Sequence, residues 1–161
     1  MKKTFGIALS VFIFCGSFFL QRSFAAEKLN PYLVKKVFLD NKPFQTNFSS
    51  PKELIDYLKQ NSTSVFKMGL DNKWEIHFLS FFQPVEDPEV YVLVFDITTK
   101  GKKEFIQRYN FTGEKGQTTL TAQLTLDSAL FCPDHKYLLD LKGYRNDEPV
   151  VLGSVEFTLQ K

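Results

Sequence analysis

Apolar and polar residues alternate along three consecutive segments in the middle of the chain. The segments are residues 74–82 (WEIHFLSFF), 89–98 (EVYVLVFDIT) and 103–112 (KEFIQRYNFT). Alternation with a period of two, in segments rich in β-branched and aromatic residues, predicts β-strands. Because the connecting loops are short, we expect neighbouring segments to pair as antiparallel hairpins.

The alternation also suggests a register for these hairpins, with most of the larger apolar side chains on one face. In the first hairpin, Trp74 lies opposite Ile97, Ile76 opposite Phe95, Phe78 opposite Leu93, and Ser80 opposite Tyr91. The second hairpin turns through residues 99–103 and adds Phe105, Tyr109 and Phe111, opposite Ile97, Leu93 and Tyr91. We expect this face to form one wall of the core.

The opposite face of the first hairpin is also apolar, at the end near residues 83–88. The same register sets Phe81 opposite Val90, Leu79 opposite Val92, and His77 opposite Val94. A sheet face in contact with water normally carries polar residues, so something must cover this one. The cover is either another part of the chain or a protein partner. In the second case the candidate partner-binding residues are Leu79, Phe81, Phe82, Val90 and Val92.

Residues 51–60 predict a short helix with a well-marked beginning. Ser50 is a capping residue, Pro51 suits the first helical position, and Glu53 completes a capping box. Such a helix is only about 15 Å long and does not persist alone in water, so it must pack on something.

One side of this helix is apolar and is formed by Leu54, Tyr57 and Leu58. The economical arrangement buries this side against the second apolar face of the hairpin. We therefore expect the helix to lie on or beside that face. Phe81 or Phe82, at the end near residues 83–88, would then remain exposed for a partner.

Five further segments predict strands: residues 34–40 as an edge strand, 65–70, 119–126, 137–141 and 150–159. Short strands separated by turn residues are typical of β-sandwiches. Residues 26–161 therefore predict a single, mainly β domain, an antiparallel two-sheet sandwich of about seven strands with one short helix.

The first 25 residues have the features of a secretory signal peptide. Two lysines precede an apolar stretch over residues 7–20, and Ser23, Phe24 and Ala25 form a small-x-small cleavage site. We expect the mature protein to begin at Ala26, to be periplasmic or secreted, and to have no membrane span. Asn47, Asn61 and Asn110 begin Asn-x-Ser/Thr sites, which matter only in a eukaryotic secretory pathway.

Residues 130–137 resemble a corner found in immunoglobulin-like and fibronectin type III domains. In those families a proline stands four residues before a tyrosine whose hydroxyl fastens the loop, as Pro133 and Tyr137 do here. The resemblance implies an immunoglobulin-like fold and no particular activity. The helix over residues 51–60 and the lack of a cysteine pair depart from the pattern.

The sequence offers few residues for catalysis or metal binding. Cys132 is the only cysteine after residue 25, and we expect it to be buried; pairing between chains and reactivity remain open. With His135 it has the residue types of a cysteine enzyme, but adjacency in one loop does not make a catalytic pair. Cys132, His77 and His135 are too few for a zinc site, and residues 86–89 lack the ligand series of a calcium loop. We expect no cofactor and no catalytic or metal site.

Charge excludes another class of function. The formal net charge of +2 becomes −1 once residues 1–25 are removed, because they carry three basic residues and no acidic one. A near-neutral chain of this kind gives no sign of nucleic-acid binding. We expect an exported, non-enzymatic β-sandwich that binds an unidentified protein partner in the cell envelope. A small-ligand or glycan-binding module and a Cys132-dependent enzyme are the alternatives.

Overall fold

The structure is a computed structural model and describes residues 31–161. These residues form one helix and eight strands: β1 (Lys36–Asp40), α1 (Pro51–Asn61), β2 (Val65–Lys67), β3 (Lys73–Phe81), β4 (Glu89–Ile97), β5 (Lys103–Thr112), β6 (Thr119–Asp127), β7 (Lys136–Arg145) and β8 (Glu148–Gln160). The signal peptide predicted over residues 1–25 lies outside the described residues.

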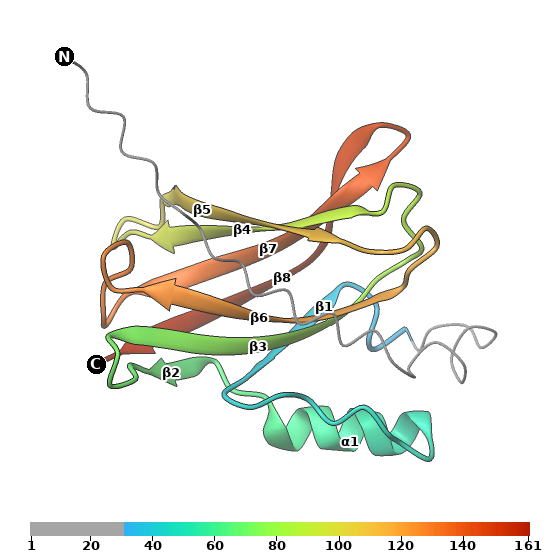
Figure 1. The fold of residues 1–161 in the computed structure, drawn as a ribbon, viewed down its shortest axis with the longest axis horizontal. Coiled ribbons are helices and arrows are strands. Elements are labelled where there is room, and N and C mark those ends of the chain that lie inside the picture. Colours follow the sequence, from blue (N-terminus) through green and yellow to red (C-terminus); the bar gives the residue numbers. More distant parts are fainter. Residues whose placement is uncertain (1–30) are drawn as a thin grey trace.

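The strands form one mixed, curled sheet in the order β5-β4-β7-β8-β1-β3-β6, and β2 adds to β8 (Figure 1). Within β5-β4-β7-β8 and within β1-β3-β6, neighbouring strands are antiparallel. The two halves join where β1 runs parallel to β8, at the pair Lys36 and Ser154. The curl brings the ends of the strand order together, since the hydroxyl of Tyr109 donates to the carbonyl of Thr125 at 3.3 Å. The main core therefore lies between the two halves.

Aromatic side chains dominate this main core. Trp74, Ile76 and Phe78 of β3 are fully buried, in agreement with the sequence. Phe78 meets Phe111 of β5 edge to face, with ring centroids 5.7 Å apart. The indole N–H of Trp74 donates to the carbonyl of Gln160 at 2.8 Å. Trp74 therefore fastens β3 to the end of β8 and is not exposed to a ligand.

The predicted hairpin between residues 74–82 and 89–98 is wrong. β3 pairs with β1 and β6, so Trp74 lies opposite Leu126. β4 belongs to the other half, where it pairs with β5 and β7. The connection after β3 crosses between the halves, and its Phe82 and Val85 are buried. Alternation fixes which side chains share a face, but it does not fix which strand lies alongside. For the same reason β1 is an interior strand between β8 and β3, not the predicted edge strand.

The second predicted hairpin forms, but its register differs from the prediction. Phe105 lies opposite Phe95, Tyr109 opposite Val92, and Phe111 opposite Val90, with a register shift between Val94 and Phe95. Such a shift changes which side chains of the two strands share a face. Val90, Val92 and Val94 point into the main core. Tyr91, Leu93, Phe95 and Ile97 point to the outside of the sheet.

Helix α1 begins as the sequence predicts. The amide of Glu53 donates to the hydroxyl of Ser50 at 3.2 Å, and the carboxylate of Glu53 accepts from the amide of Ser49 at 2.7 Å. Pro51 occupies the start of the helix. The helix therefore has satisfied donors at its first turn. Within residues 31–161, no helix is long and apolar enough to cross a membrane.

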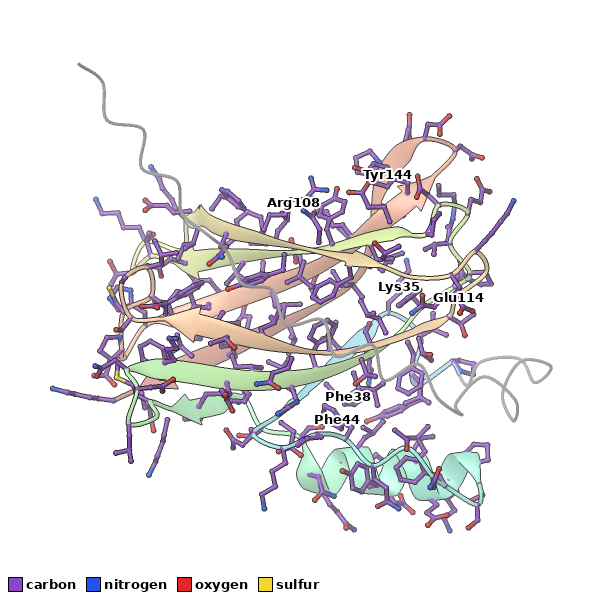
Figure 2. The ribbon with its side chains drawn as sticks, in the orientation of Figure 1. Lys35, Phe38, Phe44, Arg108, Glu114 and Tyr144 are labelled. Carbon is purple, nitrogen blue, oxygen red and sulfur yellow. The ribbon has the colours of Figure 1, made fainter. Side chains whose placement is uncertain are left out.

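The helix covers the outside of β1 and β3, as expected. Leu54 and Leu58 are buried in a second cluster with Leu79 and Phe81. Phe38 and Phe44 fill the space between β1 and the helix (Figure 2). This second cluster closes one of the two outer faces of the curled sheet.

Candidate binding face

The other outer face belongs to β5, β4 and β7, on the far side of the sheet from α1 (Figure 1). We call it the β4 outer face and define it by Tyr91, Leu93, Phe95, Ile97, Phe105, Arg108, Leu138 and Tyr144. None of these side chains belongs to the main core or to the cluster under α1. The apolar residues on this face therefore contribute neither to the main core nor to the cluster under α1.

The end of the β4 outer face toward the turn between β4 and β5 carries apolar residues on three strands. Phe105, Phe95 and Leu138 are neighbours in one row, from β5 through β4 to β7. The rings of Phe95 and Phe105 meet edge to face with centroids 6.0 Å apart. Phe105 is 59% exposed, Leu93, Phe95 and Ile97 are partly exposed, and Leu138 is buried. A contiguous apolar patch of this kind on a surface marks a contact site more often than a single exposed residue does.

Aromatic and charged side chains border the apolar patch on its side toward residues 83–88. The guanidinium of Arg108 lies 3.8 Å from the ring centroid of Tyr91, donates to Glu89 at 2.8 Å and donates to Asn110 at 2.6 Å. Tyr91 also packs against Tyr144, with ring centroids 5.8 Å apart. Burial, followed by the neighbouring Tyr144, raises the pKa of Tyr91 above its ordinary value. Arg108 and Tyr144 lie near each other at this end in Figure 2.

Arg108 is thus held in place by contacts within the chain. A guanidinium fixed over an aromatic ring and between two acceptors loses little further side-chain entropy on binding. Tyr and Arg are enriched among the residues that dominate binding energy in protein interfaces. The β4 outer face therefore combines an apolar end, near the turn between β4 and β5, with preorganised polar groups toward residues 83–88.

The candidate residues predicted from the sequence lie elsewhere, and all of them are buried. Leu79 and Phe81 pack under α1, whereas Phe82, Val90 and Val92 belong to the main core. The expectation that Phe81 or Phe82 remains exposed is wrong, because they are 3% and 0% exposed. The uncovered apolar side of β4 is the one that the predicted register assigned to the core. The inward and outward sides of β4 can be told apart only when its neighbouring strands, β5 and β7, are known. Alternation does not specify these neighbours.

Cys132 is exposed, contrary to the expectation that it is buried. Nearby, Nδ1 of His135 lies 3.0 Å from Oδ2 of Asp96, while the other carboxylate oxygen of Asp96 is buried without a hydrogen-bond partner. The His135 ring stacks on Tyr137, with centroids 6.4 Å apart. His135 is thus engaged by Asp96 and by the ring of Tyr137.

The possible metal ligands are not brought together. Among the described residues, no three His, Cys, Asp or Glu side chains are grouped so that they could hold a metal ion. His77 lies on β3, where burial lowers its pKa against the opposing effect of Glu75 and Asp40. In the loop over residues 86–89, the carboxylate of Glu86 accepts from the amide of Asn146, and that of Asp87 from the amide of Glu89.

A hollow of about 450 Å³ runs along α1 and is lined by Gln45, Phe48, Ser50, Lys52, Glu53, Asp56, Tyr57 and Gln60. Its polar groups mostly serve the chain itself. The hydroxyl of Tyr57 accepts from the amide of Gln45 at 3.1 Å, and Ser50 and Glu53 cap the helix. Ligand pockets usually have an apolar lining with a few convergent polar groups. The hollow does not have this character.

Comparisons with protein-family models and with curated protein sequences find no match. Among solved structures, the chain is similar to an immunoglobulin-like protein from Pseudomonas aeruginosa. The two are 12% identical, the similarity covers 78% of this chain and 97% of that chain, and the TM-score is 0.37. A likeness at this identity says nothing about function.

Proposed function

We propose that this chain is an exported, non-enzymatic β domain that binds a protein in the cell envelope through its β4 outer face. The observation that carries the proposal is the apolar pair Phe105 and Phe95, which belongs to neither hydrophobic cluster and of which Phe105 is 59% exposed. The equivalent surface on β1 and β3 is covered by α1. Within residues 31–161, one outer face is thus closed by α1, and the other leaves Phe105 exposed.

Export is the part of the proposal that rests on sequence alone. The charged start, the apolar stretch and the cleavage site of residues 1–25 support it. An exported domain without catalytic or metal-binding groups commonly acts by binding, which is an argument by analogy with other β-sandwiches.

We further infer that the two halves of the curled sheet act as the two layers of an immunoglobulin-like sandwich. The antiparallel orders β5-β4-β7-β8 and β1-β3-β6 correspond to the C′CFG and ABE sheets of that fold. The single connecting pair, Lys36 with Ser154, supports two layers rather than a closed barrel. In this reading, α1 occupies the connection between the first two strands of the ABE layer.

Photo-crosslinking in intact cells of the source organism tests the proposed function. A photoreactive phenylalanine analogue replaces Phe105 in one variant and Leu70 in the control. Leu70 is a fully exposed apolar residue in the turn before β3, away from the β4 outer face. We expect a defined protein adduct from position 105 and none from position 70. The absence of an adduct specific to position 105 would refute the proposal.

A further inference from the structure

We draw no further inference here: the strongest candidate, the side-chain cluster of Tyr32, Lys36 and Lys59 between the start of β1 and the last turn of α1, already has both lysine ammonium groups over the ring of Tyr32, and nothing among the described residues points to a ligand there.

Discussion

The hydroxyl of Tyr137 holds both backbone polar groups of Cys132. It accepts a hydrogen bond from the amide of Cys132 at 2.8 Å and donates one to its carbonyl at 3.0 Å. The ring is buried and stacks on Phe157, with centroids 5.6 Å apart. The corner before β7 is thereby fastened to the core, as the resemblance of residues 130–137 to immunoglobulin-like domains implies.

Tyr137→Phe keeps the ring and removes both of these hydrogen bonds. The amide and carbonyl of Cys132 lose their partner, so we expect the free energy of unfolding to fall by about 1–2 kcal/mol. Urea unfolding followed by circular dichroism measures this change. An unaltered unfolding midpoint would show that the corner does not depend on the hydroxyl.

Alkaline pH provides a second test of the same residue. Burial raises the pKa of Tyr137 from 10.0 to about 12. Because the folded state holds the proton more tightly, the stabilisation is complete below pH 10 and is lost as the pH rises toward 12. The stability of Tyr137→Phe should therefore decline less steeply over this range than that of the natural sequence. Parallel curves for the two proteins would contradict the expectation.

Sequence pattern predicts the strands well and their neighbours poorly. Alternation locates β3, β4, β5 and β6, and the Ser50 and Glu53 pattern locates the start of α1. The pairing of β3 with β1 and β6 is not predicted, because those contacts join distant segments through backbone groups that every residue carries. Local signals therefore specify elements, and the tertiary arrangement of strands requires long-range information.

The candidate site depends on that missing information. The sequence correctly indicates that β4 is apolar on both sides and that α1 covers part of an outer face. It does not indicate which side of β4 turns inward, since Val92 and Leu93 suit a core equally well. The register shift between Val94 and Phe95 decides which side chains of β5 lie on each face of β4. Such irregularities leave little trace in the apolar pattern of the sequence.

Gly153 tests the junction between the two halves of the sheet. A Cβ at this position would lie 2.9 Å from Cγ2 of Val37 and 3.0 Å from the carbonyl oxygen of Lys35. Gly153→Ala must therefore push β1 away from β8, and we expect a loss of about 1–3 kcal/mol in the free energy of unfolding. Val151→Ala, at an exposed position of the same strand, is the control and should change stability by less than about 0.5 kcal/mol. Equal effects of the two substitutions would argue against close contact at this junction.

The most direct measurement compares the free energies of unfolding of Phe81→Asp and Phe105→Asp, at a concentration where light scattering detects monomers only. Phe81 lies under α1 and is 3% exposed, whereas Phe105 is 59% exposed on the β4 outer face. We predict that Phe81→Asp costs several kcal/mol, because it buries an unpaired charge. Phe105→Asp should lower the free energy of unfolding by only about 1–2 kcal/mol, because it loses the edge-to-face contact with Phe95 and places an aspartate on a strand. A large loss for Phe105→Asp, or a negligible one for Phe81→Asp, would contradict the assignment of the covered and open faces.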